Sequence, residues 1–360
     1  MKKVFVLIAV LTCSSFAFAQ KTNSITANLE ANKEVYSAIA QQIWGFAEMG
    51  YQEEKSAALL QETLRKEDFK ITKGVAGIPT AFIAEYGEGF PVIAVLGEYD
   101  ALPGLSQEAT AEKKSAGKAA GHACGHHLFG TASTAAAIEV KNWLKANHKK
   151  GTIRFYGCPA EEGGSGKVYL VREGLFKDVD AALHWHPGDA NDANPGSTLA
   201  NKSAKFRFYG VASHAGMAPD KGRSALDGVE AMDMMVNMMR EHIPSDARIH
   251  YVITNGGKAP NVVPDFAEVY YYVRHGNRKT VVELFDRIAK AAEGAALGTG
   301  TTMKYELIGG THELLPNTTL QKMMYANLVK VGGVQYTEAE KEFGNQIMQS
   351  LGIENGDLNK

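Results

Sequence analysis

Apolar positions in the first half of the chain alternate between helical and strand-like segments. Apolar residues recur at helical spacing between residues 29 and 46 and again between 56 and 66, and residues 92–96 form a continuous apolar run typical of a buried strand. The same reading predicts a helix over 130–144 and strands over 152–156 and 179–183. This alternation favours an α/β sandwich around a mainly parallel sheet.

The pattern changes after about residue 197. Residues 205–208 alternate polar with apolar positions, 224–240 and 280–297 have helical periodicity, and 248–253 and 268–273 are strand-like. We therefore expect an α+β segment over 198–312, inserted into a first domain that covers 20–197 and resumes over 313–360. Gly309-Gly310-Thr311-His312 is interpreted as the exit hinge, and a helix is expected over 317–331.

The N-terminal residues 1–19 have the pattern of an export signal. Lys2 and Lys3 precede an apolar run over 4–11, and Ala17-Phe18-Ala19 is typical of a cleavage site before Gln20. A membrane anchor is the alternative, but the run is too short to span a bilayer. We expect an exported protein, periplasmic or extracellular, that is free of the membrane after cleavage.

Charge and cysteine content narrow the chemistry. The formal net charge is -2 and no basic block is present, so the sequence has no electrostatic footprint for nucleic acid, which favours a small-molecule partner. After signal cleavage Cys124 and Cys158 remain. Two cysteines in an oxidising compartment ordinarily form a disulfide. Cys124 lies among histidines in a glycine-punctuated loop, however, and we prefer metal ligation for it.

Polar clusters follow the predicted strands, where α/β sheets usually bind ligands. The clusters are Glu98 with Asp100; Cys124 with His126 and His127; Glu161 with Glu162; and His184 with His186. Thiolate, imidazole and carboxylate together suit zinc or a similar ion. Of the two adjacent glutamates, one can bind the metal while the other accepts a proton from water. Because side chains alternate along a strand, only one of His184 and His186 is expected to reach the shared centre.

A methionine-rich stripe has a simpler interpretation. Five methionines lie on the helix predicted over 224–240, at 232, 234, 235, 238 and 239. They could form a soft binding face, but on a helix that also carries Leu226 and Val229 we interpret them as core residues.

Four motifs in order resemble one enzyme family. They are Gly97-Glu98-Tyr99-Asp100-Ala101-Leu102-Pro103, His122-Ala123-Cys124-Gly125-His126, Pro159-Ala160-Glu161-Glu162-Gly163-Gly164 and Ser213-His214-Ala215-Gly216. The chain resembles the dinuclear metallo-aminoacylase and carboxypeptidase family, in the branch with aminobenzoyl-glutamate, hippurate and indole-acetyl-amino-acid hydrolases. The resemblance implies an α/β metallopeptidase (phosphorylase/hydrolase-like) catalytic domain with an inserted α+β lid and dimerisation domain.

The resemblance also implies residue roles. Cys124, His126, Glu162 and His186 match metal ligands, Glu161 matches the general base, and Asp100 matches an aspartate that orients the site. His214 matches a histidine that reaches the active site of the dimer partner and polarises the substrate carbonyl. Asn261 and Arg274 match substrate-binding lid positions, and Arg274 suits a carboxylate.

The expected activity is metal-dependent hydrolysis of the amide of an N-acyl or N-aminobenzoyl amino acid, with zinc or manganese, up to two ions per protomer, in a homodimer. Relatives continue further and contain a final histidine ligand, whereas the last histidine here is His312. Three alternatives follow: a truncated reading frame, a complementary subunit that completes the fold, or a catalytically silent metal- or ligand-binding paralogue with fewer metals.

Overall fold

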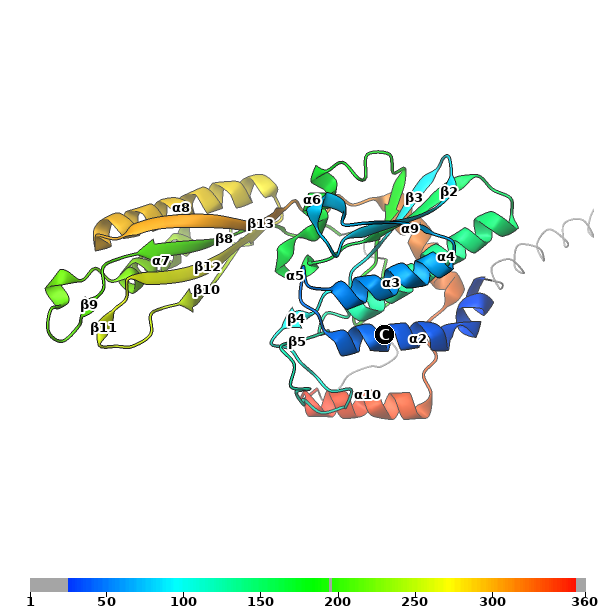
Figure 1. Ribbon diagram of the computed structural model, residues 1–360, viewed down its shortest axis with the longest axis horizontal. Helices are drawn as coiled ribbons and strands as arrows, with labels where there is room; N and C mark the ends of the chain where they lie inside the picture. The colour runs from blue at the N-terminus through cyan, green and yellow to red at the C-terminus, as the bar shows by residue number, and fades with distance from the viewer. Residues whose placement is uncertain (1–24, 194–195, 354–360) are drawn as a thin grey trace, which may run out of the picture. The chain divides into compact units, whose positions relative to one another are not determined.

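The computed structural model describes residues 25–193 and 196–353, which divide into two compact units (Figure 1). One unit runs to Ala193 and resumes at Met323, and the second runs from Asn194 to Lys322. The insert predicted over 198–312 lies inside the second unit. The predicted export signal over 1–19 lies outside the described residues.

The first unit is built on a five-stranded sheet in the order β1-β2-β6-β3-β7. Its strands are β1 (Lys70–Lys73), β2 (Phe82–Glu88), β3 (Val92–Gly97), β6 (Gly151–Gly157) and β7 (Ala181–Leu183). β3 pairs in parallel with β6 and β7, but β2 pairs antiparallel with β1 and β6. The expectation of a mainly parallel sheet is therefore confirmed in part: β1, β3, β6 and β7 run in one direction, and β2, which pairs antiparallel on both sides, makes the sheet mixed.

Helices cover both faces of this sheet. The longer ones are α2 (Lys33–Phe46), α3 (Glu54–Lys66) and α4 (His126–Ala146), and the short α6 spans Gly166–Arg172. Along β6, Phe155 packs in the core formed with α2, α3 and α4, whereas its neighbour Tyr156 packs in the core that contains Leu170 of α6. Adjacent strand residues thus serve opposite faces, as the pleat requires.

The second unit is a four-stranded antiparallel sheet in the order β10-β12-β8-β13, covered on one face by two helices. The strands are β8 (Ala200–Tyr209), β10 (Arg248–Asn255), β12 (Phe266–His275) and β13 (Thr302–Thr311), and the helices are α7 (Ala225–Met239) and α8 (Arg278–Thr299). A small ribbon of β9 (Ser213–His214) and β11 (Val262–Val263) extends from it. This is the α+β arrangement expected from the alternating pattern.

Two local predictions in this unit are wrong. Gly309, Gly310 and Thr311 are not a hinge but part of β13, where they pair with β8 after a bulge at Leu307/Gly309 that accommodates the glycines. Of the five methionines, Met232 and Met239 are buried, but 234, 235 and 238 are exposed. Their side of α7 faces away from the sheet, so an interpretation that rested on the residue type rather than on the position around the helix misassigned them.

The remaining helices follow the second unit in sequence. α9 (Thr318–Val331) agrees with the predicted helix over 317–331, and α10 (Glu338–Ser350) begins with a capping box formed by Thr337 and Glu340. Across residues 25–193 and 196–353, none of the helices is long and apolar enough to cross a membrane.

Candidate metal centre

The ends of three parallel strands place three polar loops at one edge of the first sheet. β3, β6 and β7 end at Gly97, Gly157 and Leu183, and the loops with Glu98, with the Glu161–Glu162 pair and with His186 begin there. A fourth loop lies between β5 (Ala120–Gly121) and α4 and carries Cys124, and His126 is the first residue of α4. The carboxyl edge of a parallel region is the expected place for a binding site.

His126 is fully buried and its ring orientation is fixed. Its Nδ1 lies 2.9 Å from Asp100 Oδ1 and 3.1 Å from the Asp100 carbonyl oxygen. Both oxygens only accept when Asp100 is ionised, so Nδ1 carries the proton and Nε2 offers a lone pair. A carboxylate behind a histidine in this way is typical of metal sites.

Asp100 also fixes the Glu161–Glu162 loop. Its second oxygen, Oδ2, accepts a 2.8 Å hydrogen bond from the backbone N–H of Glu162. One buried carboxylate therefore sets the positions of side chains from two separate loops, which supports the orienting role predicted for it.

Cys124 and His186 approach each other on the more open side of the cluster. Cys124 Sγ lies 3.4 Å from His186 Nε2, and His186 Nδ1 lies 2.8 Å from the Pro187 carbonyl oxygen, so Nε2 is again the free nitrogen. Gly125 permits the approach: its φ is +79°, and a Cβ there would come within 2.8 Å of Pro187. Cys124 and Cys158 are both free thiols, which leaves Cys124 available as a ligand.

Carboxylates surround the free nitrogen of His126. Glu98 Oε2 lies 3.0 Å from Nε2, and one oxygen each of Glu161 and Glu162 lies 4.0 Å from it. His126 Nε2, Glu98 Oε2 and Glu162 Oε1 are buried without a hydrogen-bond partner. Buried polar atoms without partners are costly, and a cation among them would remove that cost.

Two groups of donor atoms converge closely enough to share an ion. In each of the groups Cys124/His126/His186 and Glu98/His126/Glu161 the donor atoms lie within 4.8 Å of one another. Ligand bonds of about 2.0–2.3 Å at tetrahedral angles put neighbouring donors about 3.3–3.8 Å apart. The 3.4 Å pair of Cys124 and His186 matches that spacing, and the 3.0 Å pair of Glu98 and His126 is somewhat closer. The residues therefore fit a divalent transition metal.

The electrostatics agree with a cation-binding role. Burial, with the nearby charge of Glu98, raises the pKa of Glu161, which suits a proton acceptor near neutral pH. Burial and the neighbouring Glu162 raise the pKa of the Cys124 thiol to about 12. The thiol therefore becomes a thiolate ligand only when a bound cation offsets these carboxylates.

One prediction about the histidines is wrong. His184 and His186 were expected to face opposite ways, yet His184 Nε2 lies 3.6 Å from Glu98 Oε1 while His186 contacts Cys124. β7 ends at Leu183, so the alternation of a strand does not extend to either residue. Both histidines reach the cluster.

Sequence reasoning missed two residues of the site. Glu98 belonged to a recognised polar cluster but received no role, and Lys167 of α6 was not considered. The Lys167 ammonium donates to Glu98 Oε1. Burial alone would raise the pKa of Glu98, but His184 and Lys167 together lower it to about 2. A lysine shortly after a glycine pair has no distinguishing sequence pattern, so only the fold reveals it.

A second buried carboxylate, that of Glu53, holds the start of the Glu161–Glu162 loop. Glu53 accepts hydrogen bonds from the Ala160 N–H at 2.7 Å and from the Thr80 hydroxyl at 3.0 Å. Ala160 has a φ of +55°, an uncommon conformation for a residue with a side chain. Glu53 therefore stabilises the strained start of the Glu161–Glu162 loop. Burial raises its pKa to about 7.

Replacing Glu53 by glutamine is expected to flatten the pH dependence of folding stability. Between about pH 4.5 and pH 7 the unfolded chain releases the Glu53 proton while the folded protein retains it. Stability therefore falls as pH rises through this window, by up to about 3 kcal/mol. Glutamine keeps both contacts, since its amide can donate to the Thr80 hydroxyl. Urea unfolding at several pH values in this range measures how the free energy of unfolding changes with pH. The exposed Glu62→Gln variant should keep the wild-type pH dependence. An unchanged pH dependence in Glu53→Gln would refute the raised pKa assigned to Glu53.

The remaining predicted site residues lie in the second unit. His214 is exposed on β9, and its loop is held by a hydrogen bond from the Ala215 N–H to the Asn261 carbonyl oxygen at 3.0 Å. Phe266 begins β12 and Arg274 lies near its other end, about 26 Å away at a strand rise of about 3.3 Å per residue. The Arg274 guanidinium stacks over Tyr272. The structure thus brings Asn261 to His214 and separates Arg274 from both. Their roles stay predictions.

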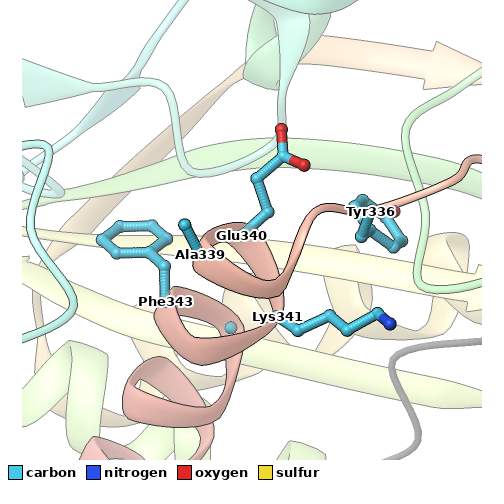
Figure 2. Close-up of a pocket in the computed structure, with 6 residues that line it drawn as sticks. Tyr336, Ala339, Glu340, Lys341 and Phe343 are labelled. Carbon is cyan, nitrogen blue, oxygen red and sulfur yellow. The ribbon is translucent and has the colours of Figure 1, made fainter.

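A cavity of about 460 Å³ lies elsewhere, at the start of α10. It is lined by Tyr336, Ala339, Glu340, Lys341, Phe343 and Gly344. Figure 2 shows these side chains pointing in different directions around the helix, and Glu340 is engaged in the capping box with Thr337. This hollow brings no catalytic groups together.

Comparisons with known proteins agree with the geometry. Residues 200–299 match the family model described as a peptidase dimerisation domain. The chain is 48% identical over 326 residues to a p-aminobenzoyl-glutamate hydrolase polypeptide of Escherichia coli, covering 90% of this chain and 68% of that protein. It is 30% identical to Xaa-Arg dipeptidase of Mus musculus, with 90% and 72% covered.

Solved structures share the fold. An aminobenzoyl-glutamate utilization protein from Klebsiella pneumoniae superimposes with a TM-score of 0.66 at 19% identity, covering 91% of both chains. A dinuclear metal binding peptidase of the M20 family from Bacillus subtilis gives a TM-score of 0.57 at 20% identity, covering 84% of this chain and 81% of that one. Together with the sequence relatives, this shared fold and the convergence of metal-binding side chains place the chain in the M20 peptidase family of metal-dependent amidohydrolases.

Proposed function

We propose that Cys124, His126, Glu162 and His186 hold divalent metal, zinc or manganese, and that Glu161 is the general base. The observation that carries this proposal is the convergence of partnerless buried atoms, His126 Nε2 and Glu162 Oε1, beside the Cys124–His186 pair. Both histidines present a free Nε2 while Nδ1 is held by an oxygen acceptor. The donor group Cys124/His126/His186 supports one such ion.

The residues suggest a direct hydrolysis. A bound divalent ion would polarise the amide carbonyl and lower the pKa of the attacking water. The Glu161 carboxylate, 45% exposed and so accessible to substrate, accepts the proton of that water and delivers it to the leaving nitrogen. Its raised pKa suits both steps, since a stronger base accepts more readily at neutral pH.

The substrate we propose is an N-acyl or N-aminobenzoyl amino acid. Support comes from the relatives, among them p-aminobenzoyl-glutamate hydrolases and a hippurate hydrolase, which act on amides of this class by their names. Arg274 offers a guanidinium for the substrate carboxylate, and Asn261 lies beside His214.

The experiment is an amide hydrolysis assay with purified protein, using p-aminobenzoyl-glutamate and hippurate with added Zn²⁺ or Mn²⁺. We expect turnover that a chelator abolishes and metal restores. Substrate binding without turnover in metal-loaded protein would contradict the enzymatic function and favour a silent binding paralogue.

We also propose that the second unit dimerises through its β10 edge. In the described sheet β10 pairs only with β12, so its other side offers unpaired backbone groups. Apolar residues are exposed beside it: Met234 and Met238 on α7, and Tyr251, Val252 and Ile253 on β10. A second copy of the chain would cover both features, and the match to a peptidase dimerisation domain supports that occupant.

Charge placed on this β10 edge is expected to yield monomers. The double variant Met238→Lys/Val252→Lys puts two ammonium groups where an apolar interface excludes water. Light scattering after size exclusion should show a dimer for the wild type and a monomer for this variant. Leu297→Lys, at a more exposed apolar position on α8, is the control and should remain dimeric. A dimeric double variant would contradict this interface.

For His214 we propose that it acts in the active site of the partner protomer. Mixing inactive Glu161→Gln chains with inactive His214→Ala chains should then restore part of the activity, since mixed dimers contain one site with both residues intact. Activity that stays at the level of the separate variants would contradict a shared site.

We propose export for the chain as a whole. The support is the pattern of residues 1–19, which precedes the described part. Fractionation of expressing cells, with N-terminal sequencing, should find protein that begins at Gln20 outside the cytoplasm; uncleaved cytoplasmic protein would contradict it.

A further inference from the structure

Glu98 lies where a metal ligand would lie, although no sequence motif assigned it that role. It follows β3 directly, is 1% exposed, and directs Oε2 to within 3.0 Å of His126 Nε2. These two atoms each offer lone pairs when His126 is in the tautomer that Asp100 fixes. At this distance they repel unless a proton on Nε2 or a metal cation lies between them.

The other oxygen of Glu98 is held separately. Oε1 accepts a hydrogen bond from the Lys167 ammonium and lies 3.6 Å from His184 Nε2. Oε2, by contrast, is buried with no hydrogen-bond partner. A carboxylate with one oxygen fixed by cationic or donor groups and the other left free is arranged to bind a metal through a single oxygen.

We propose that Glu98 is an additional metal ligand beside His126, and that Lys167 is the positioning residue that directs its free oxygen to the ion. This inference rests on the proposed ligand set, because His126 is common to both. Lys167 also compensates the charge that Glu98 adds, so the fold tolerates a third acidic side chain next to Glu161 and Glu162.

A purely structural ion pair between Glu98 and Lys167 is the competing interpretation, and a charge-matched pair of variants separates the two. Glu98→Gln/Lys167→Met removes one negative and one positive charge, so the net charge of the site is unchanged. Glu67→Gln/Lys141→Met removes an equivalent pair in the same unit, joined by a 2.6 Å contact between Lys141 Nζ and Glu67 Oε2.

Calorimetric titration with Zn²⁺ measures affinity and stoichiometry independently of activity. We expect Glu98→Gln/Lys167→Met to bind Zn²⁺ at least about 10-fold more weakly than the wild type, and Glu67→Gln/Lys141→Met to bind as the wild type does. Wild-type affinity and stoichiometry in the Glu98 double variant would overturn the inference and leave the proposed function standing. No Zn²⁺ uptake by the wild type would contradict both.

A second measurement needs no variant and so does not depend on its folding. In a crystal structure of the wild-type protein with Zn²⁺, located by anomalous scattering, Glu98 Oε2 should lie about 2.0–2.2 Å from an ion. A separation too long for a bond, with the Glu98–Lys167 contact intact, would overturn the inference.

Discussion

Replacing Glu161 by glutamine is expected to lower kcat by about 10²- to 10⁴-fold while the metal content stays that of the wild type. Glutamine preserves the size of the side chain but cannot accept a proton from water. Glu161 is the more exposed member of the glutamate pair, at 45% against 17% for Glu162, which suits a group that meets substrate rather than one committed to a metal.

The measurement is steady-state kinetics together with metal analysis by mass spectrometry. Glu173→Gln, an exposed glutamate after α6, is the matched control and should keep full activity. Full activity in Glu161→Gln would remove it as the base. Lost activity with lost metal would instead identify it as a ligand and contradict its assigned role.

Replacing Asp100 by asparagine is expected to weaken metal binding by about 10- to 100-fold. Asp100 uses one oxygen to accept from His126 Nδ1 and the other to accept from the Glu162 N–H. Asparagine has only one acceptor, so its NH₂ must face one of these donors. Either the imidazole loses the tautomer that frees Nε2, or the Glu162 loop loses its anchor.

Zn²⁺ titration of the Asp100→Asn protein measures this effect. Asp178→Asn is the matched control, because Asp178 is an exposed aspartate paired with Arg154 outside the loop cluster, and it should bind Zn²⁺ normally. Unchanged affinity in Asp100→Asn would show that its two hydrogen bonds do not organise the ligands.

The site was predictable from sequence to the extent that its residues follow strands. The sequence shows a buried strand or a glycine-containing turn just before Cys124, Glu162 and His186. Their convergence therefore follows from the ordinary geometry of α/β sheets. Their pairing in space depends on finer features. Gly125, for example, permits the contact with Pro187 that brings Cys124 to His186.

Other features were not predictable because they depend on where elements end and what packs beside them. His184 reaches Glu98 since β7 stops at Leu183, a boundary that the apolar pattern does not define. Lys167 lies on an ordinary short helix, and its role comes from its contact with Glu98 at the end of β3.

The β1 edge of the sheet was missed for a similar reason. β1 is four residues long and largely polar, so it lacks the apolar run that identifies a buried strand. It pairs with β2 at the edge of the sheet, where one side of a strand meets solvent.

Titration with Co²⁺, followed by absorption spectroscopy, tests the proposed metal centre most directly, because a thiolate bound to cobalt gives a charge-transfer band. We predict that the band appears in the wild type, persists in Cys158→Ser, whose thiol is buried against the Tyr156 carbonyl, and is absent from Cys124→Ser. A band that is missing from the wild type, or that survives in Cys124→Ser, would contradict metal ligation by Cys124.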